Sequence, residues 1–149
     1  TMKKVLLVVM SMLLFTAYSA SAKPTKFKNI KNLNSTSWKL VDLQNEELVS
    51  QYIGAKSLGI ITLDFSKKGS TVSGNSGINT YNGAYEVNGE NITFSGLTST
   101  QLYGPRNIME QEYKYLNILP NMSSFKIIDN KTLKLITSDG IELTFTRIK

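Results

Sequence analysis

Short strand-like segments follow one another from residue 37 onward, and this succession limits what the chain can fold into. Within the segments β-branched and aromatic residues recur, and clusters of Gly, Asn, Asp and Ser separate them. Turn residues at such close spacing predict an antiparallel sheet. The predicted strands are 37–43, 59–65, 71–74, 84–87, 91–94, 125–128, 133–137 and 141–146, with 98–102 as a further candidate.

The pair Asn88-Gly89 predicts a tight hairpin turn. Both central positions of a type I′ turn need positive φ, which Asn and Gly tolerate. This turn would place Val87 opposite Glu90 and would collect apolar side chains on one face. That predicted core face holds Tyr85, Val87, Ile92 and Phe94.

A second hairpin is predicted around residues 138–140. A two-residue turn there would set Leu135 against Thr144 and would scatter the apolar residues over both faces. A three-residue loop with Gly140 in a left-handed conformation instead pairs Leu135 with Leu143. We therefore predict the three-residue loop, because a slip of one residue would expose the apolar set.

One helix is predicted from about residue 105 to 119. Pro105 suits the first helical position, Asn107 and Glu110 have the spacing of a capping box, and Pro120 ends the run. The apolar stripe that would pack against the sheet holds Ile108, Met109, Tyr115, Leu116 and Leu119. The predicted fold class is therefore α+β: a strongly curved, barrel-like antiparallel sheet of about eight strands with one covering α-helix.

The first 22 residues have the order of an export signal. Lys3 and Lys4 precede an apolar stretch at 5–15, and Ala20-Ser21-Ala22 forms a small-x-small cleavage site. The stretch is too short to cross a bilayer, which needs roughly 20 helical residues. We expect a signal peptide at 1–22 that is cleaved after Ala22.

The rest of the chain is expected to divide into a flexible leader at 23–35 and one domain at 36–149. The sequence holds no Cys that could carry a lipid, so we expect no membrane anchor in the mature chain. The expected location is the periplasm or the medium. We also expect a monomer.

The absence of both His and Cys restricts the available chemistry. Ser-His-Asp and Cys-His nucleophiles and thiolate or imidazole zinc sites all need one of these residues. We therefore predict no catalytic residues, no metal site and no cofactor. A carboxylate pair could still hydrolyse glycosides, but none is evident. The net charge of +6 is scattered without interleaved aromatics, which argues against nucleic-acid binding.

Residues 74–85, Gly-Asn-Ser-Gly-Ile-Asn-Thr-Tyr-Asn-Gly-Ala-Tyr, closely resemble the glycine-asparagine signature of the META domain, also called the HslJ-like family. The opening Trp-x-Leu strand at Trp38, the Leu-x-x-Thr segment ending at Thr100 and the helix motif with Met109 and Glu112 are similar too. The resemblance covers roughly residues 33–145. Many members of the family carry Cys where this chain has Ile78 and Tyr103-Gly104.

The resemblance implies an envelope or secreted protein, often linked to stress responses such as heat shock or to drug tolerance, with no established enzymatic activity. We expect a non-enzymatic binding or interaction module whose partner is an envelope protein or a small ligand. A second hypothesis is that the protein is a barrel-type carrier of a small apolar or glycan ligand, which would need an accessible interior. A carboxylate-dependent hydrolase is the third.

The signature supplies the candidate binding residues. These are Gly74, Asn75, Gly77, Asn79, Tyr81, Gly83 and Tyr85. They either serve backbone geometry and turn amides or form a small platform for sugar or peptide. The predicted structural residues of the core and helix are Trp38, Thr100, Met109 and Glu112.

Glu112 lies on the apolar stripe of the predicted helix, where an unpaired carboxylate would be costly. It should therefore either accept hydrogen bonds or take up a proton, and we favour a hydrogen bond that locks the fold over a catalytic acid. The resemblance places residues 98–100 and Asn79 around the helix, so we expect the donors to be backbone amides or hydroxyls of 98–100 or the Asn79 amide. On that basis Glu112→Gln should be mild, because the amide keeps an acceptor, whereas Glu112→Leu should leave donors unpaired.

Overall fold

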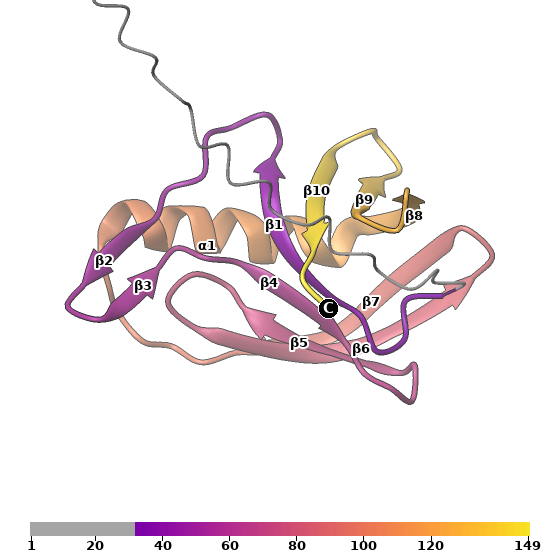
Figure 1. Ribbon diagram of the computed structural model, residues 1–149, viewed down its shortest axis with the longest axis horizontal. Helices are drawn as coiled ribbons and strands as arrows, with labels where there is room; N and C mark the ends of the chain where they lie inside the picture. The colour runs from indigo at the N-terminus through magenta and orange to yellow at the C-terminus, as the bar shows by residue number, and fades with distance from the viewer. Residues whose placement is uncertain (1–31) are drawn as a thin grey trace, which may run out of the picture.

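The computed structural model describes residues 32–149 (Figure 1). The expected signal peptide at 1–22 and the first part of the leader, 23–31, lie outside these residues. Leu33 was expected in the flexible leader, but its side chain is 1% exposed and belongs to the core. The packed domain therefore begins before residue 36.

Ten strands and two helices make up the described part of the chain. The strands are β1 (Ser37–Leu43), β2 (Gln51–Ile53), β3 (Lys56–Leu58), β4 (Thr62–Phe65), β5 (Thr71–Asn75), β6 (Thr80–Asn88), β7 (Asn91–Ser99), β8 (Met122–Ile128), β9 (Thr132–Thr137) and β10 (Glu142–Arg147). The helices are α1 (Arg106–Ile118) and the 3₁₀ helix η1 (Leu119–Asn121).

Eight of the strands form a closed antiparallel barrel in the order β1-β10-β9-β8-β7-β6-β5-β4. This confirms the predicted α+β class with a barrel-like sheet and one α-helix. The β2–β3 hairpin forms a separate two-stranded arm that was not predicted. Each of its strands has only three residues, too few for an alternating pattern to be recognised. Within residues 32–149 no helix is long and apolar enough to cross a membrane.

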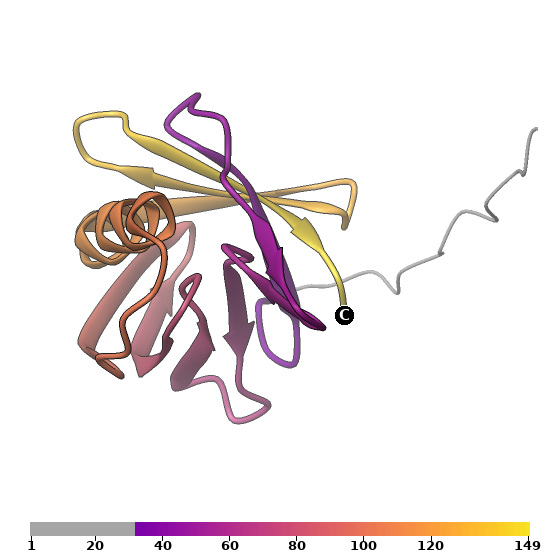
Figure 2. The ribbon, with the colours of Figure 1, turned by 90° about the vertical axis from the view of Figure 1, so that its left-hand side faces the viewer.

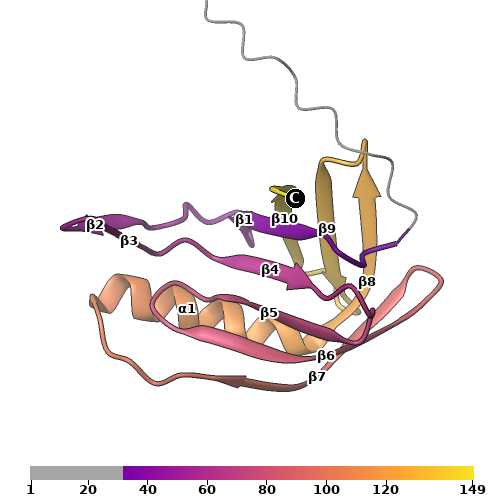
Figure 3. The ribbon, with the colours of Figure 1, turned by 60° about the horizontal axis from the view of Figure 1, so that its bottom comes forward.

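The barrel is weakest between β7 and β8. The two strands share a single residue pair, Asn91 with Ser124, and the Phe125 N–H donates to the Glu90 carbonyl at 2.9 Å. Beyond that point the strands diverge, and α1 lies between the β6–β7 hairpin and β8–β10 (Figure 2). β4 to β7 run roughly along α1, whereas β8 and β9 stand across it (Figure 3). The helix thus covers the open part of this seam.

Large side chains fill the barrel interior. Trp38, Tyr115 and Phe145 are each 0% exposed, which confirms the predicted burial of the single Trp. The Trp38 indole N–H also has a partner, the Thr36 hydroxyl at 2.7 Å. This packing does not favour the carrier reading, because a carrier would need an open interior.

The first predicted hairpin forms with a different register. Val87 pairs with Ile92 rather than Glu90, so Gly89 and Glu90 are the turn residues. Only Gly89 of the two has positive φ, 62°, as a type II′ turn requires. The predicted register was wrong by two residues, and an even slip leaves each side chain on its face. Three of the four predicted core residues are buried, namely Tyr85, Ile92 and Phe94, while Val87 is 44% exposed.

The second hairpin matches its prediction. Leu143 pairs with Leu135, and Gly140 has a φ of 91°. The Thr137 N–H donates to the Ile141 carbonyl at 2.9 Å and closes the three-residue loop. Burial of one apolar face was therefore sufficient to select between the two turns.

The N-terminal end of α1 differs from the prediction, whereas the helix ends at Ile118, close to the predicted end at about residue 119. Pro105 is the N-cap residue rather than the first helical residue, and no side chain caps the helix. The Asn107 side chain accepts from the Ile108 N–H, and Glu110 pairs with Arg106, so the predicted capping box does not form. Pro120 lies inside η1, because a proline is tolerated in the first turn of a helix.

Candidate functional site

Three side chains on one face of α1 fasten it to the rest of the domain: Gln111, Glu112 and Tyr115. Gln111 is 8% exposed, and its amide accepts from the Val49 N–H at 2.7 Å. The same amide donates to the carbonyls of Val49 and Gly59 at 3.1 and 3.0 Å. Gln111 thereby holds the segment between β1 and β4 against the helix.

Glu112 points into the loop between β5 and β6 and is 7% exposed. Its Oε2 accepts from the Ser76 hydroxyl at 2.6 Å and from the N–H groups of Ile78 and Asn79 at 3.0 and 2.8 Å. Its Oε1 accepts from the Asn79 side-chain amide at 2.6 Å. The loop forms a cradle of donors for an anion, and the helix itself supplies that anion.

These donors determine the protonation of Glu112. Burial alone would raise the pKa of its carboxyl group, because desolvation disfavours the charged form. Hydrogen bonds from Ser76, Asn79 and Ile78 together outweigh that effect and lower the pKa below the ordinary value. Glu112 is therefore ionised in the folded protein at neutral pH.

Asn79 extends the network to the segment that follows β7. Its side-chain oxygen accepts from the Leu102 N–H at 2.7 Å and from the Thr100 hydroxyl at 2.8 Å. Its side-chain nitrogen donates to the Leu102 carbonyl at 3.1 Å as well as to Glu112. One asparagine thus connects the β5–β6 loop, α1 and the segment after β7.

The other signature residues serve close backbone contacts. A Cβ on Gly74 would lie 2.1 Å from the Thr62 carbonyl oxygen, and one on Gly83 would lie 2.6 Å from a methyl group of Leu97. Gly77 has a φ of 131°, and its N–H donates to the Asn75 side chain at 2.7 Å. These contacts support the reading in which the signature serves the fold.

The two signature tyrosines belong to the core. Tyr81 and Tyr85 are 2% and 3% exposed, so they cannot offer their faces to a ligand as the platform reading required. The Tyr81 hydroxyl donates to the Thr62 carbonyl at 2.7 Å and lies 2.6 Å from the Tyr115 hydroxyl. Burial raises the pKa of Tyr81 well above its ordinary value.

The predicted donors of Glu112 were partly correct. Asn79 donates as expected, but residues 98–100 do not reach the carboxylate, and Thr100 binds Asn79 instead. Sequence reasoning missed Ser76 and Gln111. Ser76 lies within the glycine-asparagine signature, but the sequence around it does not indicate that its hydroxyl group is buried.

An open hollow of about 380 Å³ adjoins this network, and we call it the α1 groove. Residues 99–103 form one wall of the groove, and α1 forms the other. Asn79 and Glu112 also line the groove. The lining side chains of α1 besides Glu112 are Met109, Tyr113, Leu116 and Asn117. Tyr103 and Tyr113, on opposite walls, are 90% and 73% exposed, and Leu102 is 60% exposed. No lysine or arginine lines the groove.

Ile78 and Gly104 lie in contact beside this groove. A Cβ on Gly104 would be 2.4 Å from Cδ1 of Ile78. The isoleucine therefore occupies the space that a side chain at position 104 would take. The positions at which the family resemblance places cysteines are neighbours in this fold.

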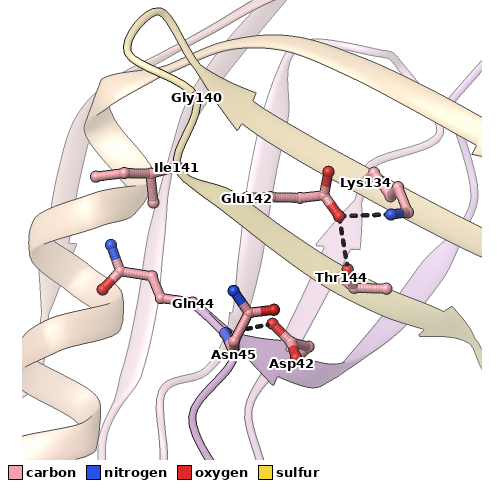
Figure 4. A pocket seen from close by; sticks show the side chains of 8 residues that line it. All are labelled: Asp42, Gln44, Asn45, Lys134, Gly140, Ile141, Glu142 and Thr144. Carbon is pink, nitrogen blue, oxygen red and sulfur yellow. Dashed lines mark hydrogen bonds and ion pairs between the residues drawn. The ribbon is translucent and has the colours of Figure 1, made fainter.

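A second hollow, of about 490 Å³, lies over β9, β10 and the turn after β1 (Figure 4). It is polar, and its charged groups already have partners. Lys134 lies 2.5 Å from Glu142, and Asp42 accepts from the Asn45 N–H at 2.9 Å. Asp42 and Glu142 are the two acids that line it. Residues 32–149 contain no group of three or more acidic side chains placed to hold a metal ion.

The arrangement defines a class of protein: a small closed barrel whose covering helix is held by a carboxylate in a glycine-asparagine loop. Residues 31–149 match the META domain, which is most of the chain. The chain belongs to the META domain family.

Solved structures with the same fold include the NMR structure of a protein from Burkholderia xenovorans. It is 23% identical, with a TM-score of 0.59 over 84% of this chain and 97% of that one. A second NMR structure is 17% identical, with a TM-score of 0.57 over 76% of this chain and 90% of the other. At such identities the similarity shows the fold alone. Among curated proteins none matches the sequence.

The geometry of Glu112 changes the expectation for its substitution by Gln. Both carboxylate oxygens of Glu112 accept hydrogen bonds. In Gln, an NH₂ group replaces one of these oxygens, so a donor would face the donor that the oxygen had bound. We predict that Glu112→Gln lowers the free energy of unfolding by roughly 1 to 3 kcal/mol and that Glu112→Leu costs more.

Urea denaturation of the variants tests this prediction. Glu110→Gln is the matched control, because Glu110 lies on the same helix with a side chain 64% exposed, and its effect should stay within about 0.5 kcal/mol. Equal stability of the wild type, Glu112→Gln and Glu112→Leu would contradict the assigned network.

Proposed function

We propose that this protein is an exported, non-catalytic binding module of the bacterial envelope and that the α1 groove is its binding site. One observation carries the proposal. Tyr103 and Tyr113 stand exposed on opposite walls of a hollow whose lining is fixed by the buried Asn79–Glu112 network. Exposed tyrosines on rigid walls are characteristic of binding surfaces, because they offer a large apolar area with a polar end.

The fixed position of the groove wall supports binding with little ordering cost. Leu102 is held by hydrogen bonds of its N–H and its carbonyl to the Asn79 side chain. Asn79 in turn is fixed by Glu112, so the wall and the helix keep one spacing. A preformed site loses less conformational entropy when it binds.

The chemistry of the groove supports binding without catalysis. Glu112 is the acidic side chain that lines it, and four donors already occupy its oxygens. Those donors keep its pKa low, so it holds no proton to deliver at neutral pH. Glycoside hydrolysis needs a second carboxylate, and none lines this groove.

The proposals of export and of a role in stress rest on the N-terminal sequence and on the family resemblance, not on the groove. The order of basic, apolar and small residues in the first 22 positions supports export. A link to stress such as heat shock is suggested by the family resemblance. We propose the periplasm or the medium as the location.

Cleavage of the signal gives a direct prediction. When the full chain is expressed in a bacterial host, mass spectrometry of the protein released from the envelope should find Lys23 as the first residue. Intact chains retained in the cytoplasm would contradict export.

The groove is tested by capture from bacterial envelope extract. The wild type should retain an extract component that Tyr103→Ser combined with Tyr113→Ser loses by roughly tenfold or more. Tyr52→Ser is the matched control, because Tyr52 is 78% exposed on the β2–β3 arm, and it should retain the component. Retention that is the same in all three proteins would exclude the groove as the binding site.

A further inference from the structure

The edge of β7 that faces α1 has no partner strand over most of its length. In the described chain β8 pairs with β7 at Asn91 alone, although β7 continues to Ser99. η1 packs against β7, whereas the backbone of α1 stands farther off. The α1 groove occupies the space between this strand end and the helix.

Hydrogen bonding to β6 shows which backbone groups of β7 face the groove. The Thr100 N–H donates to the Thr80 carbonyl at 3.0 Å, so the backbone of Thr100 points toward β6. Alternate residues of a strand direct their N–H and carbonyl groups to opposite sides. Ser99, the last residue of β7, therefore directs its N–H and carbonyl groups away from β6. Gln101 lies past the strand, between Thr100 and Leu102, whose N–H groups donate to Thr80 and to Asn79. Both Ser99 and Gln101 line the groove.

The side chains of the groove select for a particular kind of segment. Tyr103, Tyr113 and Leu116 offer apolar surface, and no lysine or arginine lines the walls. The ionised Glu112 beside them would repel an acidic side chain. A segment seated here would be neutral or basic and would carry apolar side chains at alternate positions.

We propose that the α1 groove binds an extended peptide segment of another envelope protein, which pairs as an added strand with the backbone of Ser99 at the free edge of β7 and of Gln101 just beyond it. This inference rests on the proposed function and names the partner class of the same groove. Main-chain pairing supplies binding that depends little on sequence, and the two exposed tyrosines supply the preference for apolar side chains.

The test begins with a displayed library of short random linear peptides, selected on the full chain. One selected peptide is then synthesised with a single N-methyl group at each position in turn. In an added strand, every second N–H group of the peptide points toward the strand of the protein beside it. An N-methyl group at one of these positions should weaken binding by about tenfold, whereas one at the positions between them should have little effect. The peptide should also lose affinity for the Tyr103→Ser, Tyr113→Ser protein and keep it for Tyr52→Ser.

Other results would overturn the inference. The inference fails if the library yields no binding peptide or if N-methyl groups at every position leave the affinity unchanged. It also fails if the peptide binds the Tyr103→Ser, Tyr113→Ser protein as tightly as the wild type. Chitin- and cellulose-type oligosaccharides form a parallel arm. If these bind in a tyrosine-dependent way and peptides do not, the groove remains a binding site and the peptide inference fails. The envelope capture tests the groove itself, so the two failures are distinguishable.

Discussion

The carboxylate of Glu112 in the β5–β6 loop is the interaction on which the rest of this structure depends. The barrel has a weak seam between β7 and β8, and α1 must cover it. A helix packed by apolar contacts alone could slide along the sheet, because dispersion and hydrophobic forces are not directional. Four hydrogen bonds to Glu112 fix the axial position of the helix.

The same network determines the shape of the surface. Asn79 binds Glu112 on one side and both backbone groups of Leu102 on the other. The segment after β7 therefore keeps its distance from α1 without any regular secondary structure of its own. A family signature that serves the fold thus also shapes the α1 groove, even though its own tyrosines are buried.

Alternation and turn chemistry were enough to predict the barrel, the single helix and the pairing of Leu135 with Leu143. The predicted register of the β6–β7 hairpin at Val87 was wrong by two residues. A slip of two residues keeps the same side chains on the buried face, so alternation does not distinguish the two registers. The burial of Glu112 and its bond to Asn79 followed from the helix stripe and the family resemblance. Ser76, Gln111 and the α1 groove could not be predicted, because their positions depend on contacts between distant segments.

The most direct test of this account is the stability of the wild type and of Glu112→Gln as a function of pH. The pKa of Glu112 is lowered by folding, so its contribution is present above the ordinary carboxyl pKa, about 4.3, and is lost as pH falls through the folded value. We predict that the difference in free energy of unfolding between the two proteins is constant near neutral pH and shrinks in acid. A difference that stays the same throughout would contradict the central role of this carboxylate.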